Sequence, residues 1–165
     1  MSDQQVSVYP QAKPFTDDEV EDFLTRSLIA KLCTHNEDGT IHIAPLWFKY
    51  DNGEILLGTQ EVTRKVQNIK QNQDVTVLVD THDPTLQAVI MRGRATLDYE
   101  DVIPKRIAIF EKYMGHEEAV GLANQIASAW EPVVIHVKPE QMTSFDYSKG
   151  FGISADSDAE EMKIV

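Results

Sequence analysis

The sequence is poor in three features that would indicate common classes of protein: cysteine, long apolar runs and glycine-rich nucleotide loops. It has 165 residues and one cysteine. Because Cys33 has no second cysteine to pair with, an internal disulfide and a C-x-x-C metal or redox pair are excluded. No apolar run approaches the ~20 residues of a membrane-spanning helix. Neither G-x-G-x-x-G nor G-x-x-x-x-G-K occurs, so a Rossmann or P-loop enzyme is not expected.

Positive charge is also scarce. The chain has 15 Lys and Arg against 27 Asp and Glu, a formal net charge of -12. Such a charge repels nucleic acid and anionic membranes, so we expect neither as a partner. The first residues are polar and lack the apolar core of a signal peptide, and the sequence therefore predicts a cytoplasmic protein.

Three parts of unequal length are predicted. Residues 1–13 are expected to be a flexible N-terminal segment, and residues 14–150 a single domain. Residues 151–165 are expected to be an acidic C-terminal tail, because they have almost nothing to bury. The length and the 42% apolar content suit one globular domain with a full core.

Local patterns predict a helix followed by a meander of strands. Thr16-Asp17-Asp18-Glu19 fits a capping box, so a helix is expected to start at Thr16. Asn52-Gly53 is typical of a tight hairpin turn, and Gly93 of a bend or bulge. Helices are further predicted at 63–72, 103–114 and 119–130, and strands at 28–35, 40–50, 54–59, 75–80, 86–97, 133–137 and 142–147. Strands joined by short turns favour an antiparallel barrel over a βαβ sheet.

The strongest candidate for chemistry is a strand end followed by a basic helix start. Gly58-Thr59 ends one predicted strand, and a helix begins at Thr63 with Arg64 and Lys65. Free N–H groups at a helix start bind phosphate, and two cations add charge-assisted hydrogen bonds. Taken alone, the same residues are more often an ordinary exposed helix start.

Other catalytic signatures are absent from the sequence. The five histidines show no metal-ligand spacing, so no metal site is predicted. There is no G-x-S-x-G motif, and we identify no catalytic residue. The strand predicted at 40–50 is rich in aromatic residues. Alternation along it puts Trp47 on the face of Ile43 and Pro45, and it puts Phe48 on the face of Ala44 and Leu46.

Several motifs together resemble the pyridoxamine 5′-phosphate oxidase-like superfamily of flavin-binding split barrels. The motifs, in chain order, are His42-Ile43-Ala44-Pro45-Leu46-Trp47-Phe48, Gly58-Thr59, Thr63-Arg64-Lys65, Asn68-Ile69 with Asn72, Gly93-Arg94-Ala95, and Ile135-x-Val137-x-Pro139 with Phe145-Asp146-Tyr147. The similarity runs from Thr16 to Tyr147. Each motif is weak alone, but their order and spacing make the set specific.

The resemblance implies a fold, a cofactor and a partner. The fold is α+β, an antiparallel six- to seven-stranded split β-barrel with peripheral helices. Members of the superfamily form a homodimer that binds flavin mononucleotide (FMN) at the interface. The residues that the resemblance assigns to the cofactor are Ile43, Ala44, Pro45, Leu46 and Trp47 beside the ring, Gly58 and Thr59 near the ribityl chain, Thr63, Arg64 and Lys65 at the phosphate, and Gln87 from the fifth strand.

Two departures from the genuine oxidases argue against pyridoxamine phosphate as the substrate. Phe48 stands where those enzymes carry a substrate lysine, and their C-terminal Arg-Leu-His-Asp-Arg-type ending is missing. The function predicted is an FMN-dependent oxidoreductase acting on a small substrate that the sequence does not identify. Two alternatives remain: a reductase using an 8-hydroxy-5-deazaflavin coenzyme on the same fold, and a non-catalytic flavin- or haem-binding protein.

Overall fold

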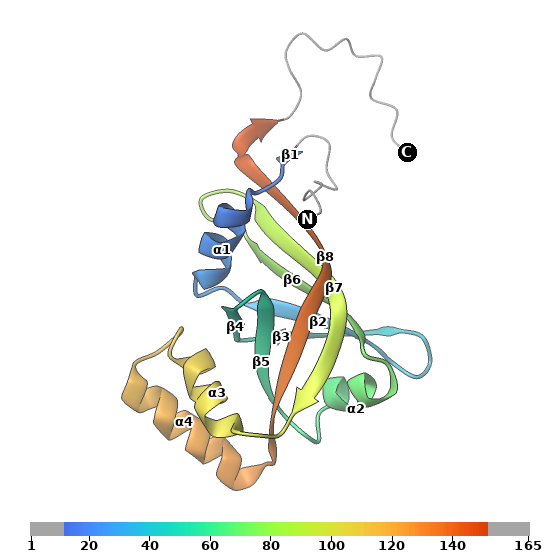
Figure 1. Cartoon of the computed structure of the whole chain (residues 1–165), viewed down its shortest axis with the longest axis vertical. Coiled ribbons are helices and arrows are strands. Elements are labelled where there is room, and N and C mark those ends of the chain that lie inside the picture. Colours follow the sequence, from blue (N-terminus) through green and yellow to red (C-terminus); the bar gives the residue numbers. More distant parts are fainter. Residues whose placement is uncertain (1–11, 152–165) are drawn as a thin grey trace.

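The structure, a computed structural model, describes residues 12–151 as one antiparallel sheet with four helices around it (Figure 1). The elements are β1 (Ala12–Lys13), α1 (Asp17–Thr25), β2 (Ala30–His35), β3 (Ile41–Leu46), β4 (Phe48–Asp51), β5 (Glu54–Gln60), α2 (Arg64–Gln71), β6 (Asp74–Thr81), β7 (Gln87–Asp98), α3 (Val102–Phe110), α4 (His116–Ala129) and β8 (Pro132–Phe151). Most of the predicted N-terminal segment and of the predicted acidic tail lies outside the described residues.

The sheet curves until its two edges come together without joining. Its hydrogen-bonded order is β3-β2-β6-β7-β8-β5-β4, and β1 pairs with β8 outside this path. The edge strands β3 and β4 are separated in the chain by Trp47 alone. Among the described strands, β3 and β4 are not paired with each other, so the barrel is split. The predicted α+β antiparallel split barrel is confirmed, with seven strands on the path and β1 as an eighth.

The prediction of one strand over residues 40–50 was wrong, because the chain changes partners at Trp47. β3 pairs with β2, whereas β4 pairs with β5 at the other edge of the sheet. One straight strand cannot pair with both edges. The Tyr113 side chain bridges the two sides of the break: its hydroxyl accepts a hydrogen bond from Phe48 N (3.1 Å) and donates one to Leu28 O (2.6 Å).

The prediction of two final strands was also wrong, because β8 runs unbroken from Pro132 to Phe151. The predicted break fell at residues 138–141, which include Pro139. In the structure Gly93 pairs with Pro139 and Arg92 pairs with Gln141, which leaves Glu140 as an extra residue. This bulge accommodates Pro139 without ending the strand. Gly93 was correctly predicted to mark an irregularity.

Alternation along the strands fills the barrel interior with apolar side chains. The fully buried residues there include Leu32, Phe48, Leu57, Val77, Met91 and Ile135. Burying a side chain such as Phe48 is worth about 1.5–3 kcal/mol. α1 packs Val20, Phe23 and Leu24 against this core, and α2 contributes Ile69. The predicted capping box of α1 is confirmed, with reciprocal bonds between Thr16 and Glu19.

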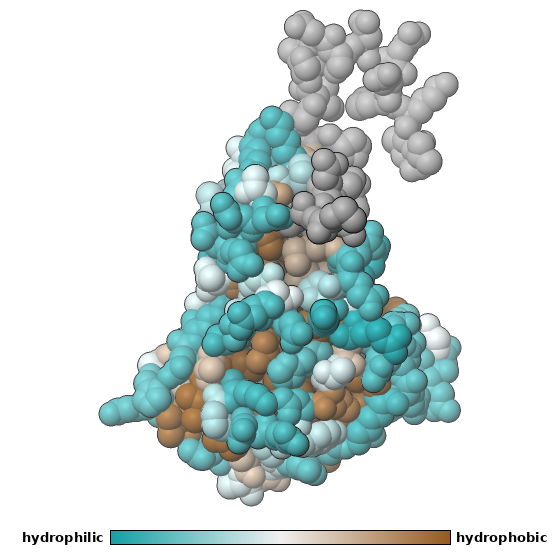
Figure 2. All heavy atoms as spheres, in the orientation of Figure 1, coloured by the Kyte–Doolittle hydropathy of each residue, from teal (hydrophilic) through white to brown (hydrophobic). Residues whose placement is uncertain are grey.

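A second apolar cluster lies outside the barrel. α3 and α4 lie side by side next to β5, on the other side of the sheet's lower end from α2 (Figure 1). Ile109, Phe110, Ala119 and Ala123 form the buried centre of this cluster. Figure 2 shows apolar side chains gathered in the lower half of the molecule, over these two helices and the neighbouring strands. The two helices therefore build a wall beside the corner at Trp47.

Gly93→Ala is expected to destabilise the fold, because a Cβ there would lie 2.0 Å from the carbonyl oxygen of Lys138. The backbone of β7 or β8 must shift, at a cost of about 1–3 kcal/mol or more in the free energy of unfolding. Gly121→Ala is the matched control. It has open space on α4 and should be neutral or stabilising by about 0.5–1 kcal/mol. Urea unfolding of both variants measures the difference, and equal stabilities would contradict the bulge geometry.

Candidate functional site

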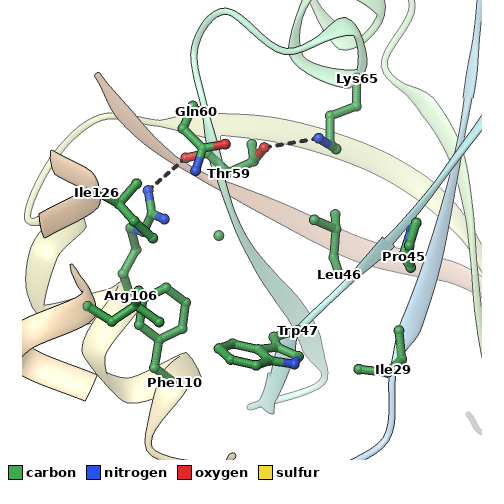
Figure 3. A pocket seen from close by; sticks show the side chains of 12 residues that line it. Ile29, Pro45, Leu46, Trp47, Thr59, Gln60, Lys65, Arg106, Phe110 and Ile126 are labelled. Atoms are coloured by element: carbon green, nitrogen blue, oxygen red, sulfur yellow. Dashed lines mark hydrogen bonds between the residues drawn. The ribbon is translucent and has the colours of Figure 1, made fainter. Parts of the chain in front are cut away.

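A pocket of about 420 Å³ lies between the corner at Trp47, strand β5 and the helices α2, α3 and α4. It is lined by Ile29, Pro45, Leu46, Trp47, Gly58, Thr59, Gln60, Lys65, Arg106, Phe110, Leu122 and Ile126. Figure 3 shows Trp47 and Phe110 below the space, Thr59, Gln60 and Lys65 above it, and Arg106 beside Ile126 at the left. The pocket thus combines a flat apolar surface with a cationic end.

The apolar surface is held by three aromatic rings. The Trp47 indole stacks on Tyr113 with ring centroids 4.9 Å apart and an angle of 11° between the planes. Phe110 meets the indole edge-on at 5.5 Å and 77°. Stacked and edge-to-face pairs add to the burial energy and restrict the rings. Trp47 therefore presents a fixed planar surface to the pocket.

The cationic end is organised around Thr59, which accepts hydrogen bonds from two basic side chains. Lys65 Nζ donates to Thr59 Oγ1 at 3.2 Å, and Arg106 Nη1 donates to the Thr59 carbonyl oxygen at 2.9 Å (Figure 3). Lys65 comes from the first turn of α2, and Arg106 comes from the middle of α3. Two helices distant in sequence therefore bring positive charge to the same residue of β5.

Both cations are partly or wholly removed from water and have no acidic partner among residues 12–151. The ion pairs of the described chain involve neither Lys65 nor Arg106. Burial lowers the pKa of the Lys65 ammonium, and it also lowers the pKa of the Arg106 guanidinium. Loss of hydration disfavours the charged form of a base, and a bound anion would restore it.

Thr63 lies beside this end of the pocket, at the N-cap of α2. Its hydroxyl donates to the Gln60 carbonyl oxygen at 2.8 Å and lies 3.3 Å from Thr59 Oγ1. Its side chain makes no capping bond to the helix. The hydroxyl therefore stabilises the loop between β5 and α2 that presents Lys65.

Arg64 points to a different part of the surface from Lys65. It lines a separate pocket of about 470 Å³ with Asn36, Glu37, Asp38 and His42. The nearby Asp38 carboxyl has a lowered pKa, mainly because Thr40 donates hydrogen bonds to it, with a smaller contribution from the charge of Arg64. Consecutive residues of a helix diverge by about 100°. The two cations predicted to act together are therefore separated in the single chain.

The other predicted residues divide between the pocket and its surroundings. Pro45, Leu46, Trp47, Gly58 and Thr59 line it. Ala44 is buried on the opposite face of β3, and Ile43 is 60% exposed on the outer face of this edge strand. Gln87 begins β7, where its side-chain oxygen accepts a hydrogen bond from Arg26 at 3.1 Å. Within one chain, Ile43, Ala44 and Gln87 are not brought into the pocket.

Sequence reasoning missed Arg106, which the structure buries to 1% exposure. Val102, Arg106 and Ile109 are spaced four and three residues apart, so they share the buried face of α3. A cation on the apolar face of a predicted helix was the signal that could have found it. Leu122 and Ile126 of α4, which the sequence analysis did not assign to the site, also line the pocket.

A family model described as pyridoxamine 5′-phosphate oxidase matches residues 16–146. The chain therefore belongs to the pyridoxamine 5′-phosphate oxidase-like superfamily, as the motifs indicated. No curated protein matches it significantly in sequence.

Solved structures agree on the fold. The conserved hypothetical protein Rv2991 from Mycobacterium tuberculosis superposes with a TM-score of 0.75 at 22% identity, covering 96% of this chain and 100% of its own. A structure named F420 reductase superposes with a TM-score of 0.60 at 21% identity, covering 74% of this chain and 94% of its own. HutZ, the haem storage protein from Vibrio cholerae, superposes with a TM-score of 0.63 at 11% identity, covering 86% of this chain and 98% of its own. The similarities establish the split barrel.

Two further observations concern residues 12–151. In this part of the chain, no group of three or more His, Cys, Asp and Glu side chains is arranged to hold a metal ion. None of the four helices there has the length and apolar character needed to cross a membrane.

Tyr113→Phe is expected to destabilise the corner that carries Trp47. The variant leaves Phe48 N and Leu28 O without the tyrosine hydroxyl, at a cost of about 1–3 kcal/mol in the free energy of unfolding. Tyr99→Phe is the control, because that hydroxyl bonds Glu61 in an exposed position and should matter by less than about 0.5 kcal/mol. Denaturant titration followed by tryptophan fluorescence compares the two, and equal costs would refute a bridging role for Tyr113.

Proposed function

We propose that this protein is an FMN-dependent oxidoreductase that acts on a small substrate and works as a homodimer. The observation that carries the proposal is the pairing of a fixed planar surface at Trp47 with uncompensated positive charge at Thr59. A flavin mononucleotide has the matching parts, a planar apolar ring system and a phosphate joined by a flexible chain. Family membership supports the proposal, since the matching family model is described as pyridoxamine 5′-phosphate oxidase.

The phosphate is assigned to the end of the pocket where Lys65 meets Thr59. A phosphate brings acceptors to the lysine ammonium and to the hydroxyls of Thr59 and Thr63. Charge-assisted hydrogen bonds of this kind contribute roughly 1.5–3 kcal/mol each. In a chain of net charge -12, a half-buried lysine without a described acidic partner is a specific feature. Arg64 adds its charge to the same helix start from the neighbouring surface.

The ring is assigned to the surface formed by Pro45, Leu46 and Trp47. The flavin supplies the electron-transfer chemistry, and the protein supplies position and electrostatics. Gly58 lines the pocket where β5 lies against the Arg106 side chain. The titratable side chains of the pocket lining are Lys65 and Arg106. The lining thus offers no carboxylate or imidazole to act as a general acid or base.

The outer face of edge strand β3 supports the proposed homodimer. Ile41 and Ile43 are 51% and 60% exposed there, and Pro45 at the end of the same face lines the pocket. A second chain seated on this face would cover both isoleucines and close the open side of the pocket. Ile43 and Gln87, which lie outside the pocket within one chain, would then reach the cofactor across the interface.

Ile43→Asp tests the dimer. A charge placed in the interface should raise the dimer dissociation constant about 100-fold or more. Val62→Asp is the control, because Val62 is 72% exposed on the loop before α2, away from this face. Analytical ultracentrifugation over a concentration series measures both variants. A monomeric wild-type protein, or a dimer unaffected by Ile43→Asp, would contradict this interface.

A deazaflavin coenzyme is the second candidate, favoured by the structural similarity to a protein named F420 reductase. The same planar surface and cationic end suit both ring systems. Direct competition between FMN and the 8-hydroxy-5-deazaflavin coenzyme separates them, because the two would occupy the same planar surface and cationic end.

The haem-binding alternative is less well supported by the pocket. The similar protein HutZ is named for haem storage. Iron in haem is held by His, Cys, Met or Tyr side chains. Among the described residues that line the pocket, none is of these types. A flavin needs no such ligand, and the pocket therefore favours flavin.

The cofactor assignment is tested by absorbance of the protein as purified, followed by titration with FMN and with riboflavin. Lys65→Met should weaken FMN binding by roughly 10- to 150-fold, because one charged bond to the phosphate is lost. Riboflavin has no phosphate and should bind equally to both proteins. Lys70→Met is the control, since Lys70 lies on the same helix and pairs with Glu61 outside the pocket.

A wild-type protein that is colourless and binds neither FMN nor the deazaflavin would refute the proposed function. Unchanged FMN affinity in Lys65→Met would instead reject only the phosphate position.

A further inference from the structure

Arg106 is a buried cation without a described function in the fold. Its side chain is 1% exposed, although it lines the pocket. Its stem packs beside Gly58, where a Cβ would lie 3.6 Å from both Cγ and Nε of the arginine. Its guanidinium carbon lies 5.5 Å from the centre of the Phe110 ring. These contacts hold the guanidinium at the pocket wall.

The hydrogen bonds of Arg106 leave its charge uncompensated. Nη1 donates to the Thr59 carbonyl oxygen at 2.9 Å, whereas Nε is buried and has no partner among the described residues. An arginine remains protonated in proteins, so it cannot escape burial by losing its proton. Burying an unpaired charge or an unsatisfied donor is costly, and buried arginines are therefore normally paired. The fold therefore keeps an unfavourable free energy of charge burial, which a bound anion would reduce.

The position of Arg106 defines where that anion would lie. Arg106 and Lys65 approach Thr59 from different sides in Figure 3, Arg106 beside Ile126 and Lys65 from the opposite wall. Phe110 lies against the guanidinium, Ile126 lies beside it in Figure 3, and Leu122 adds further apolar lining to the pocket. The arginine end of the pocket therefore suits a group that is negatively charged and attached to an apolar body.

We propose that Arg106 binds an anionic group, a phosphate or a carboxylate, of a molecule that occupies this pocket. The proposal rests on the proposed function in taking the pocket as the cofactor and substrate site. It adds a second cation, from α3, to the lysine at the start of α2. The anionic group has two sources, the phosphate of the cofactor itself or a separate anionic substrate with an apolar body.

The test compares Arg106→Gln with the wild type. Glutamine keeps a polar amide donor on a shorter side chain, but it removes the charge. Lys105→Met is the matched control, because Lys105 neighbours Arg106 on α3 and pairs with Asp98 outside the pocket. Each protein is titrated with FMN and with riboflavin, and the flavin-loaded protein is titrated with inorganic phosphate and with benzoate. Isothermal calorimetry measures all dissociation constants.

Two results support the proposal and distinguish the sources. If the cofactor phosphate lies at Arg106, Arg106→Gln weakens FMN by about 10-fold or more and leaves riboflavin unchanged. If a separate anion lies there, FMN affinity is unchanged, while phosphate or benzoate binds the flavin-loaded wild type at least about 10-fold more tightly than the variant. Lys105→Met matches the wild type in both cases.

Arg106→Gln that binds every one of these molecules as the wild type does would overturn the proposal, even if the protein is a flavoprotein. If the wild type binds no flavin, the proposed function fails, and phosphate and benzoate are titrated into the ligand-free protein instead. Binding that depends on Arg106 then supports the anion site, and equal or undetectable binding overturns it.

Thermal unfolding checks that the variants fold. Should Arg106→Gln fail to fold, Arg106→Lys replaces it, because lysine keeps the charge but loses the planar donor fork. Several-fold weaker anion binding by the lysine variant supports the proposal, and unchanged binding overturns it.

Discussion

The corner at Trp47 is the constraint on which the rest of the structure depends. Only this residue separates β3 from β4, yet the two strands belong to opposite edges of the sheet. The sheet must therefore curve round until its edges meet. The Tyr113 hydroxyl bonds backbone groups on both sides of the corner, and its ring supports the indole. The curvature of the split barrel and the flat surface of the pocket therefore both depend on this corner.

A second feature of the structure is positive charge that is partly or wholly removed from water. Thr59 joins Lys65 and Arg106, which lie 41 positions apart in the chain, through one side-chain and one backbone hydrogen bond. Neither cation has an acidic partner in the described part of the protein, although acidic residues outnumber basic ones. A fold that keeps such charges loses stability, and a ligand that neutralises them stabilises the folded state by mass action. The pocket and its ligand are expected to be coupled in this way.

Features governed by neighbouring residues were predictable from the sequence. The capping box at Thr16, the positive φ angles of the Asn52-Gly53 turn and the irregularity at Gly93 all match the structure. The errors lay where a distant partner decides the outcome. The partners of β3 and β4 split the strand predicted at 40–50, and the pairing of β8 with β7 carried one strand through Pro139. Arg106 was missed because local pattern does not show what a helix face packs against.

The sequence by itself determined the superfamily, the alternation that puts Phe48 and Ile43 on opposite faces, and the presence of a basic helix start after Gly58-Thr59. These depend on spacing along the chain, which folding preserves. Only the tertiary structure decided which cations share the pocket. Arg64 and Lys65 are adjacent in sequence but face different pockets, because consecutive helical residues diverge. Lys65 and Arg106 are distant in sequence but meet at Thr59, because β5 lies between the two helices that carry them.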